Sequence, residues 1–320
     1  MMAEAQLDDD DDVFVYMGGD QQVPDHVRRA RIHKSVKIVL ARAFQNRRQL
    51  ISVEFHDGVE VIEREAFDNC RSFKGPIKLL GVKVIKVGAF SRCKNLESVE
   101  FGDMLETIES CAFCRCHALT KIKMPSVRTV GRWAFAWCSN LSDVEFGEAL
   151  RSLELQAFHS CRNLKRIALP LKGDMIGSHV FNHCTKLSKV DLAGGIHQTV
   201  ASLNLESWRS GMSNEINSIN RVLPTITVGE TSEIQLWMAT VISRLDRYKT
   251  EHKALLKEAT MLLELALWKA NLSDNGGGKL DKEGFRMTRG SRKRARVESC
   301  VTSGASIVIK NVLPFLQLVE

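Results

Sequence analysis

The sequence predicts an α+β repeat protein, in which a solenoid of short parallel β-strands is followed by a region of long amphipathic helix. An Ala-Phe pair, once Val-Phe, recurs every 22 or 23 residues from Phe44 to Phe181. After each pair, apolar and polar residues alternate as in a half-buried strand. Beyond residue 230, apolar residues recur at three- and four-residue steps, which is typical of an amphipathic helix.

Four apolar columns define the repeat. The first is a phenylalanine column, made of Phe44, Phe67, Phe90, Phe113, Phe135, Phe158 and Phe181. Three residues later, from the second repeat onward, stands a cysteine: Cys70, Cys93, Cys116, Cys138, Cys161 and Cys184. An aliphatic residue precedes each phenylalanine by five positions, and a leucine or phenylalanine follows it by six. One such unit cannot bury its apolar face alone, so the units must stack and each column becomes a ladder.

The strand of each repeat follows the leucine column, as in Leu96, Val99 and Phe101. We expect the solenoid to cover residues 27–195, with an imperfect first rung near Val27 and one continuous parallel sheet. Pro76 lacks an amide donor, so the strand that contains it should be irregular or bulged.

The consensus Val-x-x-Ile-x-x-x-Ala-Phe-x-x-Cys-x-x-Leu-x-x-Val-x-Phe resembles the BspA-type leucine-rich repeat over residues 27–195. This resemblance implies a solenoid used for binding or adhesion, with no catalytic residues to carry over. No nucleophile, phosphate-loop or metalloprotease motif occurs elsewhere in the chain. We therefore expect no enzyme activity, no catalytic or cofactor-binding residues and no cofactor.

Residues 1–26 are expected to be an acidic lead-in, because Asp8 to Asp12 are consecutive aspartates. This segment lacks the basic flank and apolar stretch of a secretory signal, and no stretch elsewhere is apolar enough for a membrane span. We expect a cytoplasmic protein without a membrane partner. The net charge of +7 comes from 45 basic and 38 acidic residues, a mixed surface that says little about partners.

The spacing Cys111-x-x-Cys114-x-Cys116-His117 superficially resembles a zinc cluster. A structural zinc site would need a second ligand pair, and none is found at suitable spacing. We expect no metal site, and cysteines that are reduced and buried, with Cys300 as the one exception. His159 and His183 stand beside the cysteine column and are expected to be exposed turn residues rather than catalytic bases.

Residues 196–271 are expected to be helical. Ser213–Leu223 should form a short helix that ends at Pro224, and Ser232 with Gln235 fits a capping box. The apolar pattern then predicts one long helix, or two joined near Thr250. Two roles remain open for it: covering the open end of the solenoid, or self-association and partner binding.

Residues 272–300 are predicted to be a flexible basic linker and residues 301–320 a docking segment that packs back on the helix. The linker holds a candidate nuclear-import signal, formed by Arg292, Lys293, Arg294 and Arg296. A nuclear protein whose basic tail contacts nucleic acid is thus an alternative function, and so is a surface adhesin.

The leading interpretation is a scaffold that binds an unidentified protein partner through the repeat sheet. Alternate side chains of a strand face outward, so charges from neighbouring rungs should lie side by side. We expect Glu100, Lys123 and Glu145 to form adjacent opposite charges. The candidate partner-binding residues are Glu54, Glu100, Lys121, Lys123, Asp143, Glu145, Arg166 and Asp191.

Overall fold

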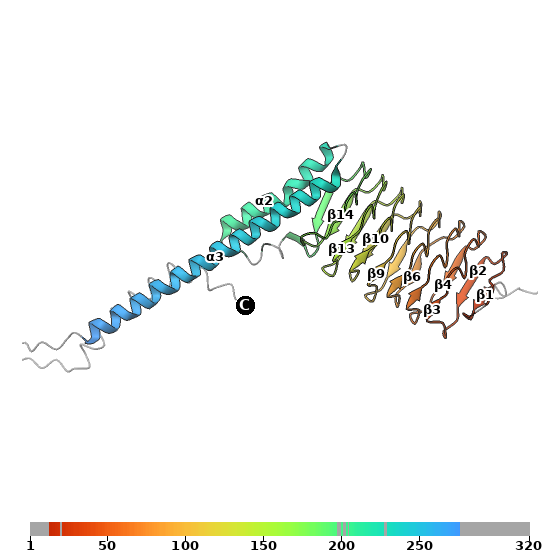
Figure 1. The fold of residues 1–320 in the computed structure, drawn as a ribbon, viewed down its shortest axis with the longest axis horizontal. Coiled ribbons are helices and arrows are strands. Elements are labelled where there is room, and N and C mark those ends of the chain that lie inside the picture. Colours follow the sequence, from red (N-terminus) through yellow and green to blue (C-terminus); the bar gives the residue numbers. More distant parts are fainter. Residues whose placement is uncertain are drawn as a thin grey trace, which may run out of the picture. The chain divides into compact units, whose positions relative to one another are not determined.

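The computed structural model describes residues 13–19, 21–196, 200, 203, 205–226 and 229–275. They divide into two units: the repeats with residues 214–242, and residues 200–213 with the chain from 243 onward. The first unit is a parallel β-solenoid whose strands follow one another in sequence order (Figure 1). The fold class predicted from the repeat is therefore confirmed.

One face of the solenoid carries the strands predicted after the leucine column. They are β1 (Val13–Tyr16), β2 (Arg29–Ile32), β4 (Ser52–Glu54), β6 (Ile77–Leu79), β8 (Val99–Phe101), β10 (Lys121–Met124), β12 (Asp143–Phe146), β14 (Arg166–Leu169) and β15 (Lys189–Leu192). All pairs are parallel. The solenoid begins earlier than residue 27, because β1 pairs with β2 in the ladder.

The expectation of one continuous sheet on this face is wrong. The strands form three hydrogen-bonded groups, β1-β2-β4, β6-β8 and β10-β12-β14-β15. The first break lies at Pro76, as expected for a residue that has no backbone N–H to donate to the ladder. Ile77 takes the inward position that the repeat would give to Pro76, and it pairs with Val99. The strand is therefore displaced by one residue and pairs only with the rung that follows.

A second parallel ladder, which the sequence did not lead us to expect, runs along the aliphatic column. Its two-residue strands are β3 (Ile38–Val39), β5 (Val61–Ile62), β7 (Val84–Ile85), β9 (Thr107–Ile108), β11 (Thr129–Val130) and β13 (Ser152–Leu153). In each strand the second residue is buried and the first is not. This ladder is unbroken, so it holds the rungs in register where the other face is interrupted.

The core consists of the predicted ladders. Phe113 is fully buried and stacks between Phe90 and Phe135, with ring centroids 5.1 and 5.2 Å away. The buried cysteines do more than fill space, because each thiol donates a hydrogen bond to the phenylalanine carbonyl of the preceding rung. In Cys138, for example, Sγ lies 3.2 Å from the carbonyl oxygen of Phe113. Burial raises the pKa of this thiol to about 12.

After the last rung, the described part of the chain contains α2 (Glu206–Val222), extended by a short 3-10 helix η1 (Leu223–Thr225), and α3 (Glu230–Asn275). The first helix begins earlier than Ser213, and α3 is one continuous helix through Thr250. The predicted capping box is wrong. The helix begins at Glu230, so Ser232 lies inside it, and the side-chain amide of Gln235 donates to the carbonyl of Ile176 instead.

Within the first unit, residues 214–242 cover the last rung, and side chains of Asn220, Thr231 and Gln235 form hydrogen bonds with its backbone. Ile216, Ile219, Ile234 and Val241 are buried there, and the indole nitrogen of Trp237 donates to the carbonyl of Glu215 at 3.2 Å. Covering the open end of the solenoid, one of the two roles predicted for the helical region, is thus confirmed for this part.

The second unit brings the start of α2 against the middle of α3. Trp208 stacks on Tyr248 with centroids 5.0 Å apart, and the guanidinium of Arg247 lies over the same Tyr248 ring. Further along α3, several large apolar side chains are exposed, among them Met261, Leu265, Leu267 and Trp268. Self-association through this helix stays a prediction.

Candidate functional site

The candidate site lies on the outward face of β10, β12, β14 and β15, where six of the eight predicted partner-binding residues meet. The parallel register aligns them in two rows across the strands. One row is Lys121, Asp143, Arg166 and Lys189, and the other is Lys123, Glu145, Ala168 and Asp191. Neighbouring rungs in such a sheet are about 4.8 Å apart, so opposite charges in a row come within reach of each other.

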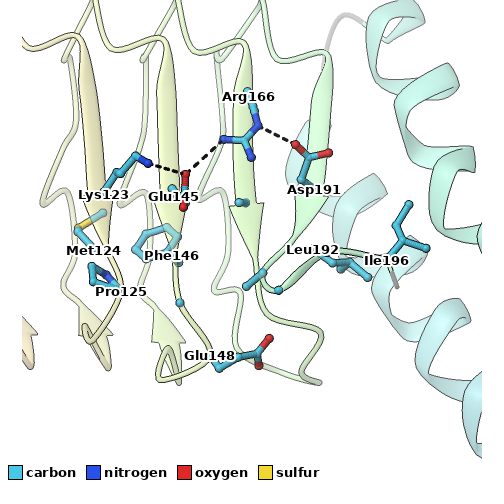
Figure 2. A pocket seen from close by; sticks show the side chains of 15 residues that line it. Lys123, Met124, Pro125, Glu145, Phe146, Glu148, Arg166, Asp191, Leu192 and Ile196 are labelled. Atoms are coloured by element: carbon cyan, nitrogen blue, oxygen red, sulfur yellow. Dashed lines mark hydrogen bonds and ion pairs between the residues drawn. The ribbon is translucent and has the colours of Figure 1, made fainter. Parts of the chain in front are cut away.

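Arg166 is the centre of the resulting ion-pair network (Figure 2). Its Nη1 lies 2.9 Å from Asp143 and 3.8 Å from Glu145, and its Nε lies 2.6 Å from Asp191. Partial burial alone would lower the pKa of Arg166, but the hydrogen bonds to Asp191 and Asp143 outweigh it and raise that pKa. Lys123 lies at the edge, 3.5 Å from Glu145, with its side chain 78% exposed.

Beside this network the surface is hollowed. The hollow, about 720 Å³ in volume, is defined by the network residues Lys123, Glu145, Arg166 and Asp191 and by an apolar group at the ends of the strands. That group is Met124, Pro125, Phe146, Leu192 and Ile196 (Figure 2). We call this feature the sheet-face hollow. Met124, Phe146 and Leu192 are almost fully buried, so the apolar surface that the hollow offers beside the fixed charges comes mainly from Pro125 and Ile196.

Ala168 departs from the sequence-based expectation. It occupies an outward position of β14, for which the alternation along the strand predicts exposure, yet only 3% of it is exposed, because the longer side chains of Glu145 and Asp191 flank it in its row. Pro125 and Ile196 were not predicted as site residues at all. Both follow strand ends, where the strand alternation that identified the other residues no longer applies.

The two remaining candidates, Glu54 and Glu100, lie outside the hollow. Glu54 pairs with Arg31 on the neighbouring β2, at 2.5 Å. Glu100 pairs with Lys78 on β6 at 3.7 Å, so the expected Glu100–Lys123 contact is wrong. The reason is the second break in the sheet: β8 and β10 belong to different hydrogen-bonded groups. The expected contact between Lys123 and Glu145 is confirmed.

A second polar surface lies on the turns that flank the phenylalanine ladder, and sequence analysis missed it. Arg115 lies over the Trp137 ring at 5.2 Å, and Arg132 lies over Trp133 at 4.5 Å. His159 contacts Trp137 edge-on, and its Nδ1 is buried without a hydrogen-bond partner. The expectation of an exposed turn residue is therefore wrong for His159, while His183 is exposed. Burial lowers the pKa of His159.

Cys111 lies on this same turn surface, and the expectation that it is buried is wrong. It is half-buried, whereas Cys114 is buried. Neither belongs to the cysteine ladder. A hydrogen bond from the Cys114 thiol lowers the pKa of Cys111 to about 7, against the opposing effect of burial and with help from the charge of Arg132. Among the described residues, no group of three or more His, Cys, Asp or Glu side chains could hold a metal ion.

Comparison with known proteins identifies the repeat. The model of the BspA type leucine rich repeat region matches residues 26–126 and 83–203, with six copies. The chain belongs to the BspA-type leucine-rich repeat family. None of the curated proteins matches the chain.

Solved structures of leucine-rich repeat proteins are similar to it. A leucine-rich repeat protein of T. pallidum is 27% identical, with a TM-score of 0.40, covering 44% of this chain and 67% of that one. One from Bacteroides ovatus is 26% identical, with a TM-score of 0.35, covering 51% of this chain and 55% of that one. Both TM-scores are below 0.5, so the family assignment depends on the family model.

Several predicted features lie outside the described residues. They are the acidic run Asp8–Asp12, the import candidates Arg292, Lys293, Arg294 and Arg296, Cys300 and the docking segment 301–320. Within the part of the chain that is described, no helix combines the length and apolar character needed to cross a membrane.

Proposed function

We propose that this BspA-type solenoid is a non-catalytic scaffold that binds a protein partner at the sheet-face hollow. The observation that carries the proposal is the coincidence, on one face, of an apolar hollow of about 720 Å³ with a network of charges fixed by the strand register. Interfaces commonly join an apolar centre to a polar rim, and complementary charge contributes specificity and association rate.

The geometry favours a particular partner chemistry. Arg166 is already surrounded by three carboxylates, so it mainly positions Asp191 and Glu145. Among the described residues Lys123 forms an ion pair with Glu145 alone, and its side chain is largely exposed. A segment that places an apolar side chain beside Pro125 and Ile196 and an acidic group near Lys123 would satisfy both parts of the hollow.

The test compares partner capture by full-length variants. Ala168→Arg would place a long cationic side chain inside the hollow, and Lys123→Glu would reverse the exposed rim charge. Arg151→Glu is the control, because Arg151 is exposed just before β13 and does not line the hollow. Proteins captured from the source cells are quantified for each variant, with thermal unfolding as the check of folding.

We expect both hollow variants to lose a specific captured protein at least about tenfold, while Arg151→Glu retains it. Ala168 is buried, so the Ala168→Arg variant can fail to fold. In that case the test depends on Lys123→Glu, because the side chain of Lys123 is largely exposed and its replacement should not disturb folding. Equal capture by the wild type and a normally folded Lys123→Glu variant would exclude the rim of the hollow as the binding site.

A further inference from the structure

The turn that carries Cys111 and Cys114 brings two thiols together at the surface of the solenoid. The amide of Cys114 donates to the carbonyl oxygen of Cys111 at 3.1 Å, which closes a β-turn between them. Such a turn holds its first and fourth Cα atoms within about 7 Å. Disulfides need Cα atoms about 4.4–6.8 Å apart, so the backbone already has the spacing of a disulfide.

The neighbouring rungs fix this turn on both sides. The amide of Cys111 donates to the carbonyl of Arg132 at 2.9 Å, and the carbonyl of Cys114 accepts from the amide of Arg92 at 2.7 Å. The two cysteines are therefore held by the stack itself, and their approach costs no rearrangement of a loop.

Packing does not require cysteine at either position. The column of Cys111, two residues before the phenylalanine, holds Arg42, Glu65, Gly88, Trp133, Gln156 and His179 in the other rungs. The column of Cys114, one residue after the phenylalanine, holds Gln45, Asp68, Ser91, Ala136, His159 and Asn182. Only one rung has cysteine in both columns. This pair is thus separate from the buried ladder, where a thiol recurs in every rung from Cys70 onward.

The two thiols differ in accessibility and in pKa, as the two members of a reactive dithiol must. Cys111 is half-buried and accessible, and the hydrogen bond from Cys114 favours its thiolate, with a pKa of about 7. The same hydrogen bond, together with burial, raises the pKa of Cys114. The accessible Cys111 thiolate can attack an incoming reagent, and the buried Cys114 thiol next to it can complete the exchange.

We propose that Cys111 and Cys114 form a redox-active dithiol that a low-molecular-weight disulfide, such as oxidised glutathione, converts into an intramolecular disulfide. The Cys111 thiolate attacks one sulfur of the reagent, forms a mixed disulfide and releases one glutathione thiolate. Cys114 then loses its proton, attacks Sγ of Cys111 and releases the second glutathione thiolate. Two protein thiols are oxidised and one disulfide is reduced, and the two released thiolates take up the two protons.

The test uses the full-length native protein and graded ratios of oxidised to reduced glutathione. After acid quenching and alkylation, the masses of the tryptic peptides are measured by mass spectrometry. The peptide of residues 95–115 contains Cys111 and Cys114 and no other cysteine, and Cys116 lies in the next peptide. We expect the first peptide to lose two hydrogens and become resistant to alkylation, while Cys116 remains unmodified until the protein is unfolded.

Two variants separate the steps, and both introduce a residue that another rung holds in the same column. In Cys114→Ala, which copies Ala136 of the following rung, the mixed disulfide with glutathione should accumulate on Cys111. In Cys111→Gly, which copies Gly88 of the preceding rung, oxidation of Cys114 should slow at least about tenfold, because the buried thiol lacks an accessible partner.

Three results would overturn the proposal. The first is a pair that stays reduced in the native protein at glutathione ratios that oxidise it in the unfolded chain. The second is a stable glutathione adduct on wild-type Cys111, which would show that Cys114 cannot complete the exchange. The third is a disulfide between two chains, visible on a non-reducing gel, in place of the intramolecular one.

Discussion

The hydroxyl oxygen of Thr231 accepts a hydrogen bond from the backbone amide of Phe181, at 2.9 Å. In the preceding rung the corresponding amide, that of Phe158, donates to the carbonyl of Val180 in the rung that follows, at 3.0 Å. Thr231 therefore supplies the acceptor that another rung would have provided. The side-chain oxygen of Asn220 likewise accepts a hydrogen bond from the amide of Val190, at 2.7 Å. Side chains of α2 and α3 thus supply hydrogen-bond acceptors to backbone amides of the last rung.

Replacing Thr231 with valine should destabilise the protein by about 1–3 kcal/mol, the cost of leaving a buried amide without an acceptor. Valine keeps the shape of threonine, so packing changes little. The free energy of unfolding is measured in urea. Thr240→Val is the matched control, because Thr240 is exposed on the same helix and its hydroxyl donates to the carbonyl of Leu236 within that helix. Equal losses in the two variants would contradict the capping role of Thr231.

Replacing Phe113 with alanine should cost about 3–5 kcal/mol, because it removes a buried ring from the middle of the ladder. Phe90 and Phe135 would each lose a stacking partner. Phe113→Leu retains most of the buried volume and should cost clearly less. Thermal unfolding reports both changes. An unchanged melting temperature for Phe113→Ala would remove this residue from the core and put the repeat register in doubt.

The sequence predicted the ladders because their residues recur with the period of the rung. Phe113 and Cys138 are recognisable from the column they occupy, and their burial follows. The two-residue strands were missed for a physical reason. A pair such as Thr129–Val130 is too short to show alternation, and only its second residue is inward. Its strand character comes from hydrogen bonds to neighbouring rungs.

The charged rows of the candidate site were also predictable, since Lys123 and Glu145 occupy outward positions of adjacent strands. The hollow was not predictable. It depends on Pro125 and Ile196, which follow strand ends, and on the small Ala168 between two longer side chains. The ends of a hydrogen-bonded sheet have no signature in the repeat. For this reason the Glu100–Lys123 contact was predicted wrongly.

Cys111 should be the most reactive of the described cysteines in the native protein. Its alkylation rate by iodoacetamide should rise with pH and reach half its maximum near pH 7, since the thiolate is the nucleophile and the pKa of Cys111 is about 7. Cys138, whose pKa is raised to about 12 by burial, should react only after unfolding. Mass mapping of peptides at several pH values measures both. A midpoint near 9, the ordinary value for a thiol, would contradict the influence of Cys114 and Arg132.

Arg166 should stabilise the protein chiefly because its positive charge lies among three carboxylates that would otherwise repel one another. Any single ion pair should contribute less to stability. A half-exposed ion pair contributes little to the free energy of unfolding, about 0.2–1 kcal/mol. Replacing Arg166 with methionine, however, leaves Asp143, Glu145 and Asp191 close together with much less positive charge between them. We expect a loss of about 1–2 kcal/mol at low ionic strength.

The salt dependence of that loss distinguishes repulsion from packing. Added salt screens charges at the surface, so the loss caused by Arg166→Met should fall by about half in roughly 0.5 M NaCl. Lys189→Met is the control. It removes one contact with Asp191, at 3.3 Å, while Arg166 stays in place, so it should cost less than about 0.5 kcal/mol at either ionic strength. A loss for Arg166→Met that does not change with salt would mean that the packing of the Arg166 side chain contributes more to stability than its charge.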